Sequence, residues 1–376
     1  AQEAGLAGYP VFTRKFNTDV AYLAAARALL ARPDSFYPQF ATHNAHTIAA
    51  VADLAGDAPY EFQRLFGMGA PVYRQVVEAL QKPCRIYAPV GGHRDLLAYL
   101  VRRLLENGAN TSFVHRLADD EAPIPAIVAD PVEKAVRLPE KANPAIPVPP
   151  DLYGSARRNR LGLPLWDDAT RAPLLAAMSE VLDTPASAAP IVAGQEIDTA
   201  DGMQIVSPHD HRVLVGTCAL ADDKSVDAAL DAAKGAASEW DARGGAARAS
   251  ILERAADLFE AARPRLMALL VREAGKTLGN AQSDLREAVD FLRYYAAEAR
   301  ANFETPVTLK GPTGESNEMS RHGRGVFAAI SPWNFPLAIF TGQVAGALAA
   351  GNAVVAKPAE QTPLIAAAAT RLLHEA

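Results

Sequence analysis

The chain has 376 residues, of which 49% are hydrophobic, and 37 basic against 43 acidic residues give a net charge of −6. This length predicts two or three domains with ample core, and the mild acidity excludes a global attraction for nucleic acid or an anionic membrane. The sequence holds no apolar run long enough to span a membrane, and its two cysteines give neither a disulfide framework nor a zinc site.

Residues 10–117 alternate short apolar runs with helical patterns. We expect helices over 20–31, 47–54, 72–80 and 95–107, and strands over 39–42, 60–65 and 85–88. A strand followed by a helix, repeated three times, is typical of parallel strands with helical crossovers. This part of the chain therefore predicts an open α/β sheet or part of a barrel.

A Pro-rich stretch over 120–164 holds nine of the 27 prolines. Such a composition predicts a stiff, extended connector. We therefore divide the chain into a first domain over 1–119, a linker over 120–164 and a second domain over 165–376.

The second domain is predicted to be mainly helical up to residue 303. Helical periodicity falls on 169–182, 226–240, 246–262, 264–274 and 278–301, with strand-like runs at 203–206 and 212–217. Beyond Gly325 the pattern changes to strands at 326–330 and 353–356, followed by helices at 337–350 and 363–374. This last pattern predicts one βαβα unit of a nucleotide-binding sheet.

Two loops follow the strands of that unit. Asn334 lies in the first loop, Ser331-Pro332-Trp333-Asn334-Phe335-Pro336, where a fixed amide donor can stabilise an oxyanion on an aldehyde carbonyl; the alternative is a turn former or helix cap. Lys357 and Glu360 lie in the second loop, where they can bind ribose hydroxyls; the alternative is a pair of solvated charges. The sequence contains no G-x-G-x-x-G turn for a pyrophosphate, so a dinucleotide needs another binding mode.

These loops, with Glu273-Ala274-Gly275-Lys276-Thr277 and Gly351-Asn352, resemble the aldehyde dehydrogenase superfamily. The resemblance implies that Asn334 is the oxyanion-hole amide and that Lys357 and Glu360 hold the adenosine ribose of NAD. A 2′-phosphate would meet the Glu360 carboxylate, which favours NAD over NADP. The residues that the resemblance places along the cofactor cleft are Ile330, Ser331, Pro332 and Trp333. The family's cysteine nucleophile and glutamate base would follow residue 376, and we expect Cys218 to be a small buried hydrophobic residue.

The helix expected over 95–107 carries Arg102, Arg103 and Glu106 among apolar residues. Paired guanidinium groups suit a carboxylate, and Glu106 could accept from an ammonium, so the set suits an amino-acid ligand. The alternative is an ordinary solvated face, but Tyr99 and its apolar neighbours leave little purely polar surface. Further polar side chains follow the predicted strands, where βα barrels place functional groups: Thr42, His43, Asn44, Gln63 and Tyr87. His43 taken alone would be a structural histidine.

This region resembles the C-terminal half of the proline dehydrogenase barrel. The resemblance is carried by YPVFTRK at 9–15, YPQFATHNAH at 37–46, CRIYAPVG at 84–91 and LLAYLVRRLLENGANTSFVHR at 96–116. It implies that Arg102 and Arg103 bind the proline carboxylate, with Tyr87 and Glu106 in the same pocket. The residues that it implies for FAD are Thr13, Thr18, Thr42, His43, Asn44 and Gln63.

A chain that carries these two resemblances in this order resembles proline utilization A, a family of bifunctional enzymes. The expected fold class is α/β: the C-terminal part of a (β/α)8 proline dehydrogenase barrel, a Pro-rich linker, and the N-terminal part of a Rossmann-like aldehyde dehydrogenase domain. The family relation implies that L-proline is oxidised to pyrroline-5-carboxylate on FAD, and glutamate semialdehyde to L-glutamate with NAD.

The same relation implies a quinone or other electron acceptor for the flavin, a homo-oligomer and a cytoplasmic location, with peripheral contact at the inner membrane left open. It implies no metal, and no nucleic acid bound through this segment.

Two other functions are left open. One is a single-activity NAD-dependent aldehyde dehydrogenase with a non-catalytic N-terminal domain. The intact Arg102–Arg103 pair argues against a loss of activity in that domain. The other is a non-enzymatic ligand-binding scaffold. Because the chain begins at Ala1 and lacks the thiol nucleophile and the early barrel residues, we expect a fragment that is inactive by itself.

Overall fold

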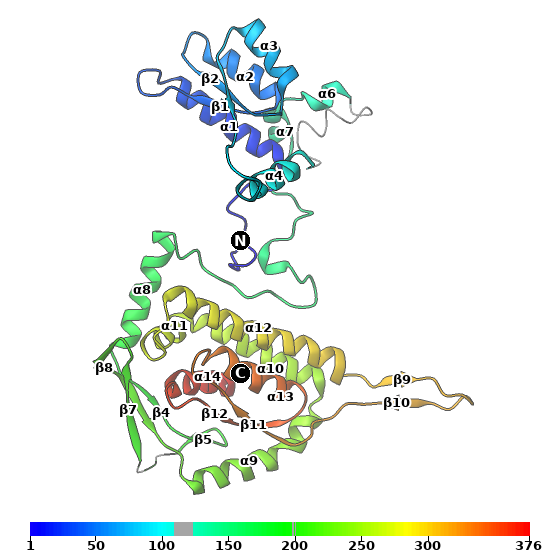
Figure 1. Cartoon of the computed structure of the whole chain (residues 1–376). Coiled ribbons are helices and arrows are strands. Elements are labelled where there is room, and N and C mark those ends of the chain that lie inside the picture. The colour runs from blue at the N-terminus through cyan, green and yellow to red at the C-terminus, as the bar shows by residue number, and fades with distance from the viewer. Residues whose placement is uncertain (109–122, 198, 200) are drawn as a thin grey trace. The chain divides into compact units, whose positions relative to one another are not determined.

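The computed structural model describes residues 1–108, 123–197, 199 and 201–376. These residues form two compact units (Figure 1). One unit comprises Pro10–Ile146, and the other comprises Ala1–Tyr9 with Pro147–Ala376. None of the described helices is both long and apolar enough to cross a membrane.

The Pro10–Ile146 unit is built on a three-stranded parallel sheet of order β1-β2-β3. The strands are β1 (Gln39–Ala41), β2 (Glu61–Leu65) and β3 (Cys84–Tyr87), joined by α2 (Ala45–Ala55) and α3 (Ala70–Leu80). The other helices are α1 (Lys15–Leu30), α4 (His93–Gly108), α6 (Ile124–Ile127) and α7 (Pro131–Arg137). The predicted parallel strands with helical crossovers are therefore confirmed.

Aromatic side chains form much of the core of this unit. Edge-to-face contacts run from Phe40 to Tyr60, from Tyr60 to Phe62 and from Phe62 to Tyr73. The charged exception is Glu61, which is buried in β2 and accepts hydrogen bonds from Arg85 at 2.6 and 3.0 Å. These bonds hold the pKa of Glu61 below its ordinary value, so the buried carboxylate is compensated by a cation on the neighbouring strand.

The Pro-rich stretch contains more regular structure than its composition predicts. Helices α6 and α7 each have a proline in their first turn, where the missing N–H is not needed and the fixed φ suits a helix. Helix α7 packs on α1. A short 3₁₀ turn, η1 (Pro149–Asp151), follows in the other unit. The stretch is thus partly helical rather than uniformly extended.

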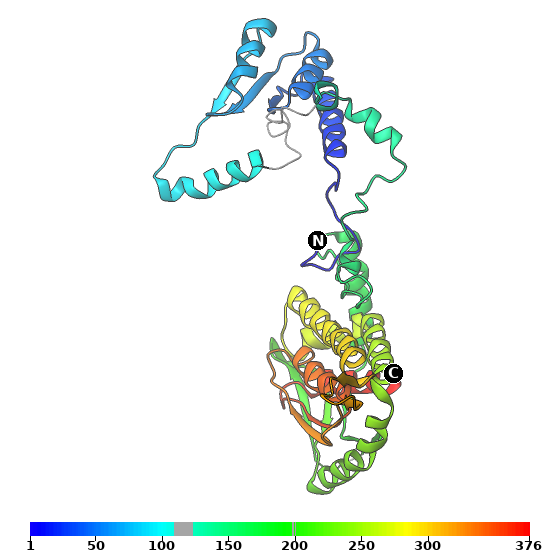
Figure 2. The same cartoon turned by 90° about the vertical axis from the view of Figure 1, so that its right-hand side faces the viewer.

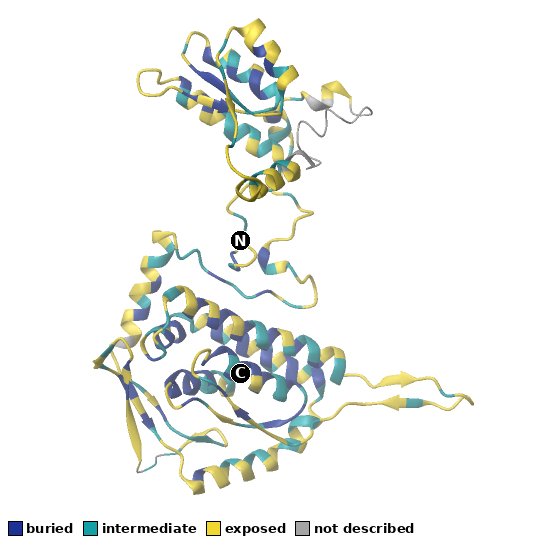
Figure 3. Cartoon of the chain, viewed as in Figure 1, coloured by how far each residue is buried: buried dark blue, intermediate teal, exposed yellow. Residues whose placement is uncertain are grey.

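The second unit is mainly helical, as predicted. Its helices are α8 (Asp168–Leu182), α9 (Asp223–Ala242), α10 (Gly244–Ala261), α11 (Arg263–Arg272), α12 (Leu278–Phe303), α13 (Ala338–Ala349) and α14 (Pro363–Glu375). Helices α10 and α12 lie side by side (Figure 1, Figure 2). Their facing sides are buried together with α13 and α14 (Figure 3), and Phe259, Leu285 and Leu292 are almost fully enclosed there.

The strands of this unit form several small sheets. They are β4 (Ala186–Ala188), β5 (Ile191–Val192), β6 (Gln195–Glu196), β7 (Gly202–Ser207), β8 (Asp210–Ala219), β9 (Val307–Leu309), β10 (Asn317–Met319), β11 (Val326–Ile330) and β12 (Ala353–Lys357). The β9–β10 pair is an antiparallel hairpin that extends away from the helices (Figure 1). The sequence analysis did not predict β4, β5, β6, β9 and β10.

The predicted βαβα unit is confirmed. Strands β11 and β12 pair in parallel, and both α13 and α9 pack against them. Asn352 stabilises the crossover between β11 and β12, because its side-chain oxygen accepts from the backbone N–H groups of Arg324 and Gly325, at 2.5 and 3.2 Å. Its amide donates to the carbonyl of Ala347 at 3.2 Å. Gly351, with φ +87°, supplies the turn before it.

Candidate functional site

The ends of β11 and β12 bring the two predicted loops together. Ile330 and Lys357 are register partners, and the backbone N–H of Ser331 donates to the carbonyl of Lys357 at 3.2 Å. Ile330 and Trp333 are 68% and 59% exposed, whereas Ser331 is buried. The exposed side chains therefore lie at the carboxyl edge of the parallel pair, where open α/β sheets bind ligands.

Asn334 is exposed in the loop between β11 and α13. The N-cap of α13 is Leu337, so Asn334 does not have the capping role considered as an alternative. Its side chain makes no hydrogen bond to any residue that the structure describes. An amide in this state has its donors available for an incoming oxygen.

Lys357 and Glu360 are also exposed, at and just beyond the end of β12. Gln361 donates a long hydrogen bond to Glu360, at 3.5 Å. Exposure suits both ribose binding and solvated charges, so the assignment of these two side chains stays a prediction.

Two buried acidic groups to which the sequence analysis gave no role lie next to the two loops. Glu273 and Asp284 are buried. Burial raises the pKa of Glu273 to about 8, against the opposing effect of two backbone N–H donors. Burial also raises the pKa of Asp284, although Lys276 and one N–H act in the other direction. The signal for Glu273 and Lys276 was present in the quoted Glu-Ala-Gly-Lys-Thr motif, but no sequence pattern pointed to Asp284.

The ends of β1 and β2 bring together four of the residues predicted for the flavin. Tyr73 joins the two strand ends, because its hydroxyl donates to the carbonyl of Thr42 and, at 3.2 Å, to that of Gln63. The Asn44 side chain caps α2 by accepting from the N–H of His46 at 3.0 Å. The His43 ring packs edge-on against Tyr73. Tyr73 itself was not predicted, since its apolar helix gave it no functional signal.

Thr13 and Thr18 lie outside this cluster. The Thr13 hydroxyl accepts from the N–H of Asn143 at 2.8 Å, and Thr18 is exposed on α1. Among the described residues, neither threonine forms a hydrogen bond with the ends of β1 and β2.

Tyr87 and Arg103 both lie close to Tyr99, a residue that the sequence analysis did not place in the site. The rings of Tyr87 and Tyr99 are 6.3 Å apart, and the Arg103 guanidinium lies 5.4 Å from the Tyr99 ring. Arg102 is exposed on the same helix. Glu106 belongs to α4, but its side chain lies outside the described residues. Leucines on α4 are exposed as well, so the choice between a ligand site and a solvated face stays a prediction.

Neither cysteine resembles an activated nucleophile. Cys218 is buried in β8 and burial raises its pKa, which confirms the expected role of a small buried hydrophobic residue. Burial also raises the pKa of Cys84.

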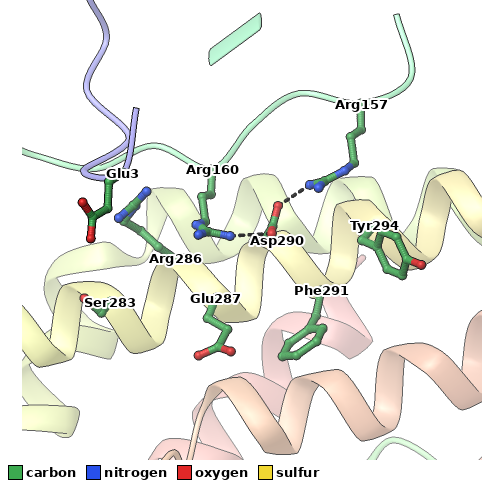
Figure 4. A pocket seen from close by; sticks show the side chains of 9 residues that line it. All are labelled: Glu3, Arg157, Arg160, Ser283, Arg286, Glu287, Asp290, Phe291 and Tyr294. Atoms are coloured by element: carbon green, nitrogen blue, oxygen red, sulfur yellow. Dashed lines mark hydrogen bonds and ion pairs between the residues drawn. The ribbon is translucent and has the colours of Figure 1, made fainter. Parts of the chain in front are cut away.

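A hollow of about 410 Å³ lies over α12 in the second unit (Figure 4). Arg157 and Arg160 both pair with Asp290, and Arg286 points into the same hollow near Glu3 (Figure 4). Glu287 adds a third carboxylate to the lining. The lining therefore holds three basic and three acidic side chains, and its charges balance.

Comparisons with known families match both halves of the chain. Residues 1–116 match the model of the proline dehydrogenase family, and residues 195–376 match that of the aldehyde dehydrogenase family. These matches, with the two sheets described above, confirm the predicted fold class.

Individual proteins match over the whole chain. The bifunctional protein PutA of Klebsiella aerogenes is 51% identical over 100% of this chain and 29% of its own length. A crystal structure of a proline utilization A mutant from Bradyrhizobium japonicum is 48% identical, with a TM-score of 0.82, over 100% of this chain and 35% of that one.

A 1-pyrroline-5-carboxylate dehydrogenase from Thermus, crystallised with bound NAD, is 34% identical with a TM-score of 0.56, over 58% of this chain and 42% of that one. The chain thus spans about a third of the proline utilization A proteins that it matches. It belongs to the proline utilization A family, in the section where the end of the proline dehydrogenase region is followed by the start of the aldehyde dehydrogenase region.

Proposed function

We propose that the chain supplies parts of two redox sites of a bifunctional proline-catabolic enzyme. Segment 1–119 contributes to oxidation of L-proline to pyrroline-5-carboxylate, and 165–376 contributes to oxidation of glutamate semialdehyde to L-glutamate, with 120–164 as the connector. The observation that carries the proposal is the contact series Tyr87–Tyr99–Arg103, which sets a guanidinium, the group that suits a ligand's carboxylate, beside two tyrosine rings.

In the proline site, Arg103 and Arg102 would bind the substrate carboxylate, because a guanidinium presents a planar fork of donors. Tyr87 and Tyr99 would pack against the apolar ring, and Glu106 would accept from the ring nitrogen while that nitrogen carries its proton. The charges would fix the orientation of the substrate.

The residues at the β1–β2 ends fit a flavin. Thr42, Asn44 and Gln63 supply hydroxyl and amide groups at one sheet edge, and Gly69, with φ +66°, leaves room there for the His43 ring. A Cβ at Gly69 would lie 2.7 Å from that ring. We propose that these side chains, with His43, Thr13 and Thr18, hold FAD, which when bound would supply the electron acceptor for the oxidation.

In the aldehyde site, Asn334 would donate its amide N–H to the carbonyl oxygen of the substrate as negative charge develops there. The exposed donor and acceptor at Lys357 and Glu360 fit the two hydroxyls of a ribose. We propose that they hold NAD along Ile330, Ser331, Pro332 and Trp333, and that NAD when bound would supply the hydride acceptor. Neither cysteine of this chain is proposed as the nucleophile.

The remaining partners follow from the same family. We propose a quinone or another acceptor that reoxidises the flavin, assembly as a homo-oligomer, and a cytoplasmic location with peripheral contact at the inner membrane.

The test uses the full-length protein that carries this sequence. We expect flavin absorbance, proline-dependent reduction of a dye, and NADH formation that depends on glutamate semialdehyde. NADH formation without flavin would indicate a single-activity dehydrogenase. A folded protein with neither activity would indicate a ligand-binding scaffold and would overturn the proposal.

A further inference from the structure

One five-residue segment contacts the starts of the two helices that follow the proposed aldehyde and ribose loops. The segment Glu273–Thr277 joins α11 to α12. It turns at Gly275, which has φ +68°, and a Cβ there would lie 2.9 Å from Pro208. Glycine is therefore required for Glu273 and Lys276 to leave the segment in their present directions.

The Glu273 end holds the start of α14, three residues beyond Glu360. One oxygen of the Glu273 carboxyl group accepts from the N–H of Leu364 at 2.7 Å, and the other accepts from that of Ile365 at 2.9 Å. The N-cap residue of α14, Thr362, makes no side-chain cap of its own. Because the first N–H groups of a helix need acceptors, Glu273 replaces the missing local cap of α14. It thereby holds the end of the loop that precedes α14 in place.

The Lys276 end holds the start of α13, four residues beyond Asn334. The Lys276 ammonium pairs with Asp284 at 3.2 Å, and Asp284 accepts from the N–H of Ala338 at 2.7 Å. The same ammonium lies 4.3 Å from the ring centroid of Phe335, the residue next to Asn334. The Asp284 side chain is fully buried and that of Lys276 is 11% exposed, so this contact chain is shielded from water and rigid.

We propose that Glu273–Thr277 positions both loops of the aldehyde site, with Lys276 and Asp284 orienting Asn334, and Glu273 orienting Lys357 and Glu360. This inference rests on the proposed function for the roles of the loops. Lys276, Asp284 and Glu273 are positioning residues, since they reach the reaction only through the loops. Because each end serves one loop, the two ends control different steps.

The first experiment measures kcat, and the dissociation constant of NAD by fluorescence titration, in the full-length protein. The Lys276→Met, Asp284→Asn double variant removes the ion pair without leaving a buried charge. We expect kcat to fall at least tenfold and the NAD dissociation constant to stay within twofold. For Glu273→Gln we expect the NAD dissociation constant to rise at least fivefold, with a smaller loss of kcat. The conservative variant Lys276→Arg should keep most of the wild-type kcat, because a cation stays beside Phe335.

A matched control separates positioning from general loss of stability. Arg293 is a buried cation on α12 that pairs with Glu260 at 3.0 Å, and we have not placed it at either loop. Arg293→Met should lower the melting temperature as much as the double variant while changing kcat and the NAD dissociation constant less than twofold. Asn334→Ala supplies a second check: in that background the double variant should lower kcat no further, because its effect passes through Asn334.

Hydrogen exchange gives a readout that needs no activity. The double variant should speed amide exchange over 333–338 and leave 357–365 unchanged, and Glu273→Gln should do the reverse. If the wild type oxidises no aldehyde but the exchange pattern holds, the proposed function fails and the positioning contacts stand. If both variants lower kcat and NAD affinity alike, or speed exchange in both loops alike, the inference is overturned.

Discussion

Ile330 and Lys357 are direct partners in the parallel register of β11 and β12. The last residue of each strand therefore lies at the same level, and the two loops that follow begin side by side. The Ser331 N–H, which donates to the Lys357 carbonyl at 3.2 Å, continues the pairing one step into the loop. Two sequence motifs separated by a helix thus become one edge, on which a dinucleotide and an aldehyde could lie together.

Arg103→Met should raise the apparent KM for proline in the full-length protein. Loss of one desolvated guanidinium–carboxylate contact typically costs about 2–4 kcal/mol, which corresponds to roughly 30-fold or more. Proline-dependent dye reduction over a range of proline concentrations measures the effect. The matched control is Arg94→Met, which removes an exposed arginine from the first turn of the same helix and should leave KM unchanged. An unchanged KM in Arg103→Met would show that Arg103 does not bind the carboxylate.

Tyr73→Phe should weaken flavin retention. The hydroxyl donates to carbonyls of Thr42 and Gln63, so its loss frees the ends of β1 and β2 and costs about 1–2 kcal/mol. The ratio of flavin to protein after gel filtration, with urea unfolding beside it, measures both effects. Tyr60→Phe is the control, because the buried Tyr60 hydroxyl has no hydrogen-bond partner among the described residues and its removal should be neutral or stabilising. Equal flavin loss in both variants would contradict the bridging role.

Glu360→Gln should shift the cofactor preference toward NADP. Removal of the carboxylate removes its repulsion of a 2′-phosphate, so kcat/KM for NADP should rise about tenfold, or ~1.4 kcal/mol. NAD efficiency should fall in the same variant, since the amide is a weaker acceptor for ribose hydroxyls. Steady-state NADH and NADPH formation measures both. Glu375→Gln, at the far end of α14, should change neither. A NADP efficiency that Glu360→Gln leaves unaltered would place Glu360 away from the ribose.

The stability of the second unit should fall as pH rises from about 5 to 8. Glu273 has a folded pKa of about 8 against an ordinary value of 4.5, so in this window the folded state keeps a proton that the unfolded state releases. Stability then falls by up to about 1.4 kcal/mol per pH unit. Glu273→Gln removes this titration, so its free energy of unfolding relative to the wild type should rise by about 3 kcal/mol between pH 5.5 and 8.

Tryptophan fluorescence during urea unfolding isolates that unit, because Trp166, Trp240 and Trp333 all belong to it. A difference between Glu273→Gln and the wild type that stays constant with pH would mean that Glu273 is ionised throughout. Glu253→Gln is the control, since this residue forms an exposed pair with Arg300 and should add no pH dependence in this window.

Sequence periodicity predicted the long and buried elements well. The helix expected over 278–301 is observed as Leu278–Phe303, and the strands expected at 326–330 and 353–356 are observed almost unchanged. In α12 the apolar residues Leu285, Val289 and Leu292 face the core and therefore repeat with the helical period. Strand β11 is exposed at four of its five positions, and it was predicted from its continuous apolar run. The β9–β10 hairpin shows the opposite case: Val307, Thr308 and Leu309 are all exposed, so burial imposes no pattern on them.

The candidate site was open to prediction where one motif carries the side chain, as for Asn334 and Lys357 in the loops after β11 and at the end of β12, whose roles stay predictions. It was not predictable where a residue is defined by what the fold brings to it. In the sequence, Tyr99 is one more apolar residue of its helix, and only the structure shows that Tyr87 and Arg103 lie close to it. In the sequence, Asp284 resembles a solvated charge, and only the structure shows its ion pair with Lys276 and its hydrogen bond from the Ala338 N–H. Such roles depend on contacts between distant segments, which a single sequence does not record.

The three hydrogen bonds of Asn352 have a consequence for how the chain acquires its structure. They join chain positions no more than 28 residues apart, so closing this loop costs little chain entropy. The crossover can therefore assemble rapidly from local contacts and act as an early nucleus, onto which α9, more distant along the polypeptide, later docks. Asn352→Ala would then slow folding more than it speeds unfolding.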